Sequence, residues 1–153
     1  MVSEDYSVYT RNNYTPGFGY YSWYYNPYMA NMVTEYRYND IMVLSYNADG
    51  VRQWDNFVYK EQYSIEDRGL FSSYLLLNTG GTIGFLYNDF NTSRSKVQLA
   101  TVDADGRKED HSFSIEGNDY ADWLPRFGKQ VSGREIIVPC LHRKQICFAK
   151  VVF

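Results

Sequence analysis

Acidic side chains in predicted loops are the residues of this sequence with the clearest capacity for chemistry. Glycoside hydrolysis uses two carboxylates that flank the scissile bond, and Asp67, Asp119 and Asp122 lie in segments that we expect to form loops. Both histidines, His111 and His142, lie in polar settings close to predicted turns. No Gly-x-Ser-x-Gly motif is present to expose a nucleophilic serine. Because loop acids are usually just solvated, we assign no catalytic residue and keep a glycan-active hydrolase as the alternative hypothesis.

The acidic turn Asp103–Gly106 is the best candidate for a metal loop. An EF-hand places oxygen ligands at alternating positions and a bidentate acid at the twelfth. With Asp105 and Gly106 as its fifth and sixth positions, the first is Thr101 and the twelfth is Ser112, and neither fits. A glycine-rich phosphate cradle between a strand and a helix is also missing from the sequence. The sequence therefore predicts neither a metal ion nor a cofactor.

Cys140 and Cys147 lie on either side of a predicted hairpin turn at 142–145. A four-residue loop would make them a close pair on adjacent strands, within reach of a disulfide. A two-residue loop gives the other type of pair, which suits a disulfide less well. Two free thiols used as small apolar residues are therefore the favoured interpretation, and the disulfide is the alternative.

Tyrosine is concentrated near the start of the chain, which is the best candidate for a binding surface. Ten of the sixteen tyrosines lie between Tyr6 and Tyr38, with few aliphatic residues among them. Aromatic rings with a polar tip give contact area at low entropic cost, as in many protein and carbohydrate binding sites. Rings that pack on each other across a hairpin are the structural alternative. The predicted binding residues are Tyr20, Tyr21, Trp23, Tyr24, Tyr25 and Tyr28.

Composition and charge exclude several classes of partner. The formal net charge is −3, whereas nucleic-acid binding requires a basic face. The longest apolar runs are far too short for a membrane-spanning helix. The first five residues have neither the basic start nor the apolar stretch of a signal peptide. We expect a protein or carbohydrate ligand, no nucleic acid and no membrane span, with homo-oligomerisation through sheet edges or the aromatic hairpin as a further expectation.

A strand followed by an Asx-x-Asp-Gly turn occurs twice, and a related strand ends the chain. Ile41–Tyr46 runs into Asn47–Gly50, Val97–Val102 runs into Asp103–Gly106, and Ile146–Val152 is the third strand. Self-similarity at this spacing is typical of repeated β-meanders. Each turn should end in a left-handed glycine, and the Asx side chain should accept a hydrogen bond from a backbone N–H two residues on.

The remaining β-rich segments complete an all-β, antiparallel fold. We expect two four-stranded meander repeats plus a closing strand over residues 41–153, arranged as a partial β-propeller-like array or, alternatively, a two-sheet β-sandwich. Residues 1–40 should form a separate Tyr-rich hairpin or loop, with strands at Ser7–Arg11 and Met32–Tyr38. The other predicted strands are Val51–Tyr59, Ser73–Leu77, Thr82–Tyr87, Arg107–Ile115, Arg126–Val131 and Glu135–Val138.

Residues 36–153 resemble the C-terminal part of uncharacterised bacterial propeller-like envelope proteins. The resemblance rests on Tyr38–Leu44, on the turn and returning strand Asn47–Trp54, and on the segments Asp67–Tyr74 and Phe85–Asp89. In such proteins a strand enters an Asp-Gly turn and the returning strand carries a tryptophan.

The second copy in this chain departs from that pattern, with Asp110 where the first copy has Trp54. The resemblance implies an extracytoplasmic location, whether periplasmic, cell-surface or secreted, within a longer parent protein whose signal peptide is not in this chain. It also implies a non-catalytic binding or scaffolding role. We therefore expect a binding module that uses the Tyr/Trp hairpin as its contact surface.

Overall fold

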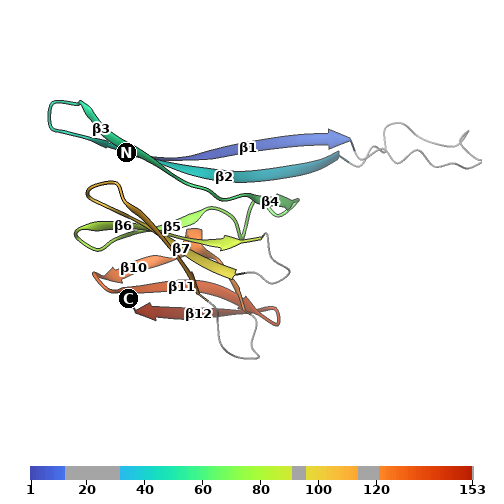
Figure 1. Ribbon diagram of the computed structural model, residues 1–153. Helices are drawn as coiled ribbons and strands as arrows, with labels where there is room; N and C mark the ends of the chain where they lie inside the picture. The colour runs from blue at the N-terminus through green and yellow to red at the C-terminus, as the bar shows by residue number, and fades with distance from the viewer. Residues whose placement is uncertain (13–31, 91–95, 114–120, 153) are drawn as a thin grey trace, which may run out of the picture.

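The computed structural model describes residues 1–12, 32–90, 96–113 and 121–152, which form three four-stranded antiparallel sheets (Figure 1). We name the sheets A, B and C in chain order. Sheet A contains β1 (Val2–Asn12), β2 (Met32–Tyr46), β3 (Arg52–Val58) and β4 (Gln62–Ile65). Sheet B contains β5 (Tyr74–Asn78), β6 (Thr82–Asp89), β7 (Lys96–Asp103) and β8 (Lys108–Phe113). Sheet C contains β9 (Asp122–Trp123), β10 (Lys129–Ser132), β11 (Glu135–His142) and β12 (Gln145–Val152).

The all-β, antiparallel prediction is confirmed, but the strands are grouped differently from the prediction. The first repeat strand and the second strand of the expected N-terminal hairpin are a single strand, β2, which crosses the expected boundary at residue 40. β1 pairs along β2 from Val2↔Val43 to Asn12↔Met32, so the hairpin belongs to sheet A. β3 pairs with one half of β2 and β4 with the other half. The described residues therefore form three sheets, where the sequence predicts two meanders, a closing strand and a separate hairpin.

The two Asx-x-Asp-Gly turns have the same predicted geometry. The Asn47 side chain accepts hydrogen bonds from the N–H groups of Asp49 and Val51, at 3.0 and 2.8 Å. The Asp103 carboxylate likewise accepts from residues 105 and 107, at 2.9 and 2.8 Å. Gly50 and Gly106 have φ values of +78° and +83°, a conformation that glycine adopts without steric cost. Both turn predictions are confirmed.

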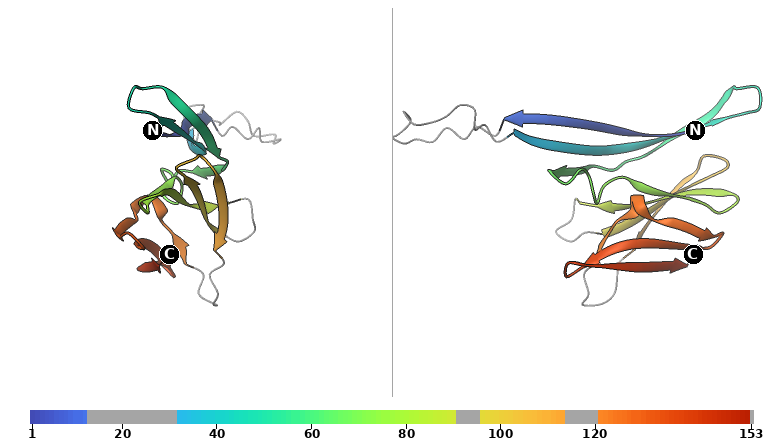
Figure 2. Two further views of the ribbon diagram at one scale, coloured as in Figure 1. Left: turned by 60° about the vertical axis from the view of Figure 1, so that its left-hand side comes forward. Right: turned by 180° about the vertical axis from the view of Figure 1, so that it is seen from behind.

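Sheet B lies between the other two sheets, and each of its faces packs against one of them (Figure 2). Alternate residues of a strand point to opposite faces, so Phe85 faces sheet A and Leu86 faces sheet C. The A–B core contains Ile41, Val43, Val58, Phe85, Tyr87, Ala100 and Val102. The B–C core contains Leu75, Leu77, Leu86, Val97, Leu99, Ile136 and Val138.

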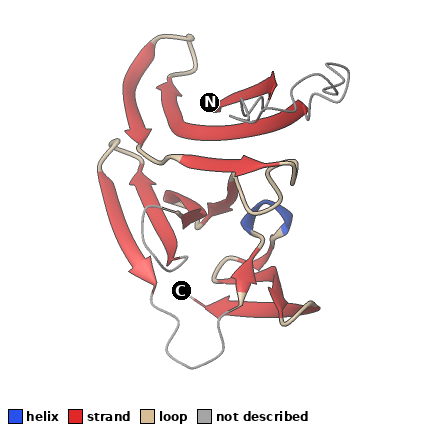
Figure 3. Ribbon diagram, turned by 90° about the vertical axis from the view of Figure 1, so that its right-hand side faces the viewer, coloured by secondary structure: helices blue, strands red, loops and turns tan. Residues whose placement is uncertain are grey.

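The predicted strand at Arg126–Val131 is wrong in its first half. Pro125–Phe127 is a 3₁₀ turn, drawn blue in Figure 3, and β10 begins only at Lys129. Proline fixes φ near the helical value and has no N–H to give to a sheet, so Pro125 favours the turn. Among the described residues there is no helix of the length and apolar character needed to cross a membrane.

Cys140 and Cys147 form a disulfide, so the interpretation as two free thiols is wrong. They are directly paired across β11 and β12, with Cα atoms 4.8 Å apart. The connecting turn has two residues, Arg143 and Lys144, with φ values of +46° and +67°. This turn type normally contains Asn or Gly, so its residue types do not reveal the loop length. The disulfide therefore forms across the two-residue turn that the sequence favoured less for it.

Candidate functional site

The Tyr-rich segment, which contains the predicted binding residues, lies outside the described residues. Tyr20, Tyr21, Trp23, Tyr24, Tyr25 and Tyr28 all belong to residues 13–31. The structure nevertheless describes the strands that lead into and out of this segment. β1 and β2 remain paired up to Asn12↔Met32, and β4 pairs with β2 only as far as Glu35↔Ile65. The segment therefore joins the strand ends of a two-stranded ribbon that projects from the body of the molecule (Figures 1 and 2).

Three side chains of sheet A form an exposed row at the base of the ribbon, where β4 still pairs with β2, and we call it the Tyr9–Arg37–Tyr63 row. They come from β1, β2 and β4. Arg37 of β2 is directly opposite Tyr63 of β4. Tyr9 of β1 is opposite Glu35, which is two residues before Arg37 on β2. The Arg37 guanidinium lies 5.4 Å from the centre of the Tyr9 ring and 5.7 Å from that of Tyr63. Tyr9 is 54% exposed and Tyr63 is 42% exposed. Both distances are within the range of cation–π attraction, so the row is organised without a ligand.

Glu35 lies on the same face of sheet A as this row, directly opposite Tyr9 and two residues from Arg37 on β2. Its side chain is almost buried and forms ion pairs with Arg11 and, at 3.7 Å, with Arg37. The end of β4 is tied to β2 because the Glu66 N–H donates to the Thr34 carbonyl at 3.0 Å. The Thr34 N–H donates in turn to the Glu66 carboxylate. These contacts limit the conformations of Arg37 and Tyr63, which lowers the entropy that a partner would have to remove on binding.

A hollow of about 320 Å³ lies beside the row. Arg37, Asn39, Glu61, Gln62 and Tyr63 line it. A cavity of this size accepts one large side chain or one sugar unit, since small-ligand sites begin at about 300 Å³. The row therefore borders a concave site that is lined by one cationic side chain, Arg37, and one anionic side chain, Glu61.

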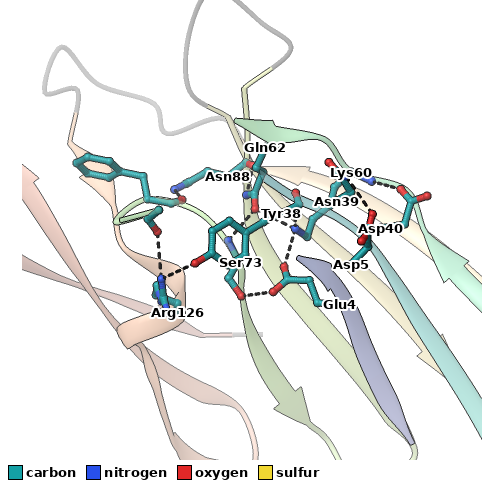
Figure 4. Close-up of polar contacts among 12 residues, drawn as sticks. Glu4, Asp5, Tyr38, Asn39, Asp40, Lys60, Gln62, Ser73, Asn88 and Arg126 are labelled. Carbon is teal, nitrogen blue, oxygen red and sulfur yellow. Dashed lines mark hydrogen bonds and ion pairs between the residues drawn. The ribbon is translucent and has the colours of Figure 1, made fainter. Parts of the chain in front are cut away.

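A buried polar network fixes the strands that carry the row (Figure 4). Lys60 has a side chain that is 2% exposed and forms an ion pair with Glu4 at 2.7 Å. Its ammonium also donates to the Gln62 side chain at 2.9 Å and to the Tyr38 carbonyl at 3.1 Å. Burial lowers the pKa of Lys60, and the Glu4 carboxylate opposes this shift. The second Glu4 oxygen accepts from the Ser73 hydroxyl at 2.7 Å, so the network joins sheet A to the segment that precedes sheet B.

The same network extends to sheets B and C. Gln62 donates to the Asn88 carbonyl at 2.7 Å. Asn88 donates to the carbonyls of Phe71 and Trp123, each at 2.8 Å. Arg126 donates to the Tyr38 hydroxyl at 3.3 Å; burial raises the pKa of this phenol, and Arg126 opposes the rise. Buried polar groups that are paired in this way add specificity to packing between sheets, so we assign the network a structural role.

The structure brings two of the three acids that the sequence predicts in loops to one place, although Asp122 begins strand β9 and is not a loop residue. Asp67 and Asp122 both line a second hollow, of about 270 Å³, at the meeting point of the three sheets, whereas Asp119 is outside the described residues. The other lining residues are Tyr63, Ser64, Phe71, Asn88 and Phe90. The buried Asn88 Oδ1 and Ser64 Oγ have no hydrogen-bond partner within the part of the chain that is described. An acid pair beside aromatic rings is a combination that suits a hydroxyl-rich ligand.

The two histidines do not join these acids. His111 lies on the exposed side of β8, where its ring is 3.6 Å from Glu109, and His142 ends β11 opposite Gln145. Across the described ranges, no group of three or more His, Cys, Asp or Glu side chains is arranged to hold a metal ion.

Sequence reasoning did not identify the Tyr9–Arg37–Tyr63 row, because its members are far apart in the chain. Their proximity depends on the register between β1 and β2, and residues 13–31 lie between those strands. A weak signal was present in Tyr36-Arg37-Tyr38, an arginine between two tyrosines on a β-rich segment. No family model matches the chain, and no curated protein or solved structure matches it either.

Proposed function

We propose that this chain is a non-catalytic binding module whose contact surface is the projecting β1–β2 ribbon together with the part of β4 that pairs at its base. The observation that carries the proposal is the exposed Tyr9–Arg37–Tyr63 row, in which an arginine lies within reach of two tyrosine rings. Tyrosine and arginine are enriched among the residues that dominate the energy of protein–protein interfaces. A protein partner is therefore the preferred ligand, with a side chain anchored in the hollow beside Arg37 and Tyr63.

The Tyr-rich segment extends this surface in our proposal. Tyr20, Tyr21, Trp23, Tyr24, Tyr25 and Tyr28 follow β1 and precede β2 in the chain, so they are attached to the end of the ribbon farthest from sheet B. The face-to-face packing of sheets A, B and C supports a partial propeller-like array as the scaffold. The expected extracytoplasmic location, in a periplasmic, cell-surface or secreted protein, remains part of the proposal.

A phage-displayed peptide library selected against the 153-residue chain tests this proposal, because such selections favour the energetically dominant surface. We expect Arg37→Ala and Tyr9→Ser to weaken the selected peptides at least tenfold. The Tyr21, Trp23 and Tyr25 triple change to Ala tests the Tyr-rich segment separately. Tyr46→Ser is the matched control, since Tyr46 is 47% exposed at the opposite end of β2. Peptides that bind all these variants as tightly as the original chain would refute the proposal.

A glycan-active hydrolase is a second candidate, favoured by the shared position of Asp67 and Asp122 at one hollow. Phe71, Phe90 and Tyr63 supply aromatic rings on the same lining, and sugar faces commonly stack on such rings. A panel of polysaccharides assayed for release of reducing sugar tests turnover, and Asp67→Asn and Asp122→Asn should each abolish it. If no polysaccharide is cleaved but one binds, with affinity lost in both variants, the hollow is a binding site without catalysis.

A further inference from the structure

The outer face of sheet C carries exposed apolar side chains around one ion pair, Lys150 with Glu135 at 2.7 Å, and none of the described sheets packs on it. Ile146, Phe148 and Val152 alternate along β12 and are 72%, 70% and 65% exposed. On the neighbouring strand Ile137 is 37% exposed and pairs with Lys150, which lies between Phe148 and Val152 on the same face. The opposite face of this sheet contributes Ile136 and Val138 to the core shared with sheet B. Large exposed apolar patches on a soluble chain usually mark a contact surface.

Sheet A, at the other end of the stack, also has an outer face with apolar residues. Ile41, Val43 and Val58 point into the core shared with sheet B. Met42 and Leu44 alternate with these residues along β2 and therefore point outward. Met42 pairs with Phe57, which is 36% exposed. The stack thus ends in two outer faces that each present apolar side chains beside charged ones, with Asp55 on the face of sheet A and the Lys150–Glu135 pair on the face of sheet C.

We infer that a second copy of this chain covers these faces, with sheet C of one copy stacked on sheet A of the next. The argument is the continuity of the stack, because the chain already buries two sheet-on-sheet interfaces of this kind, A on B and B on C. A symmetric contact between the outer faces of two C sheets would leave the outer face of sheet A uncovered in both copies. A head-to-tail contact instead pairs the outer face of sheet C in one copy with that of sheet A in the other. Such heterologous contacts form closed rings when the rotation closes and open filaments when it does not.

The test uses light scattering coupled to size-exclusion chromatography, with one variant for each face. The unmodified chain should show a concentration-dependent mass above the 18.0 kDa of a monomer. Phe148→Asp places a charge on the outer face of sheet C, and Phe57→Asp places one on the outer face of sheet A. Each variant alone should associate at least tenfold more weakly than the unmodified chain. When the two variants are mixed, each supplies the face that the other lacks, so a 1:1 heterodimer should form.

Leu76→Asp is the matched control, since Leu76 is 48% exposed on sheet B, which lies inside the stack. This variant should associate as the unmodified chain does. Circular dichroism and urea unfolding establish that each variant is folded, and Phe57→Ser replaces Phe57→Asp if the aspartate variant is not. The inference is overturned if the unmodified chain remains monomeric, if the A-face variant retains full association, or if the folded variants do not associate when mixed.

Discussion

Gly50 and Gly106 offer a controlled test of how sheet A supports the second Asx-x-Asp-Gly turn. The two glycines have the same place in identically hydrogen-bonded turns and nearly equal φ values, +78° and +83°. A Cβ atom on Gly50 would meet nothing within 4 Å, whereas one on Gly106 would lie 2.8 Å from the Trp54 ring. Trp54 is held there because its indole N–H donates to the Ala104 carbonyl at 3.0 Å.

The two substitutions to alanine should therefore have unequal costs. Both place an L residue in the left-handed region, which costs about 1–2 kcal/mol. Gly106→Ala also forces the Trp54 ring away from the turn, and overpacking of this kind adds about 1–3 kcal/mol. We expect Gly50→Ala to lower the free energy of unfolding by about 1–2 kcal/mol and Gly106→Ala to lower it by about 2–5 kcal/mol.

Equilibrium unfolding in urea measures both losses, and a double-mutant cycle isolates the tryptophan. In a Trp54→Ala background the clash is removed, so the cost of Gly106→Ala should fall to that of Gly50→Ala. Equal costs for the two glycines in the unmodified background would refute the reasoning, because they would mean that the Trp54 ring does not restrain the turn.

Three further predictions concern buried groups. Lys60→Met leaves the Glu4 carboxylate without its cation and should lower the free energy of unfolding by about 3–5 kcal/mol. Adding Glu4→Gln should recover part of this loss. If the second change recovers nothing, Lys60 and Glu4 are not a buried ion pair. Burial raises the pKa of Tyr87 to about 12 from 10.0, so the folded state holds more protons than the unfolded state between these values, and stability should fall as pH rises through them. The loss is up to about 3 kcal/mol at about 1.4 kcal/mol for each pH unit, and urea unfolding of Tyr87→Phe should lack this component; an unchanged pH dependence would argue against the raised pKa. Replacing both Cys140 and Cys147, which are seven residues apart, by serine should lower the free energy of unfolding by about 2 kcal/mol, because the unfolded chain regains the entropy of the open loop. If the double change leaves thermal unfolding unaffected, the disulfide does not restrain the unfolded chain.

Local features of the sequence predicted the strands and turns well, because both depend on short-range chemistry. Asn47 and Asp103 bond to backbone N–H groups only a few residues away, and Gly50 and Gly106 allow positive φ. Alternating and near-continuous apolar runs similarly predict half-buried and buried strands. Pro125 is a further local signal, because its fixed φ and missing N–H favour the 3₁₀ turn Pro125–Phe127 over a strand that begins at Arg126.

What only the tertiary structure decided is the proximity of residues that are distant in the chain. The register between β1 and β2 places Tyr9 near Arg37, and the pairing of β4 with β2 adds Tyr63. The packing of three sheets brings Asp67 and Asp122 to one hollow. The disulfide joins Cys140 and Cys147 across a two-residue turn, Arg143 and Lys144, although from the sequence a two-residue turn favoured this pairing less than a four-residue one. Turn chemistry and strand propensity act over a few residues, whereas pairing across long connections is selected by the packing of the whole core, and no short segment of sequence contains that information.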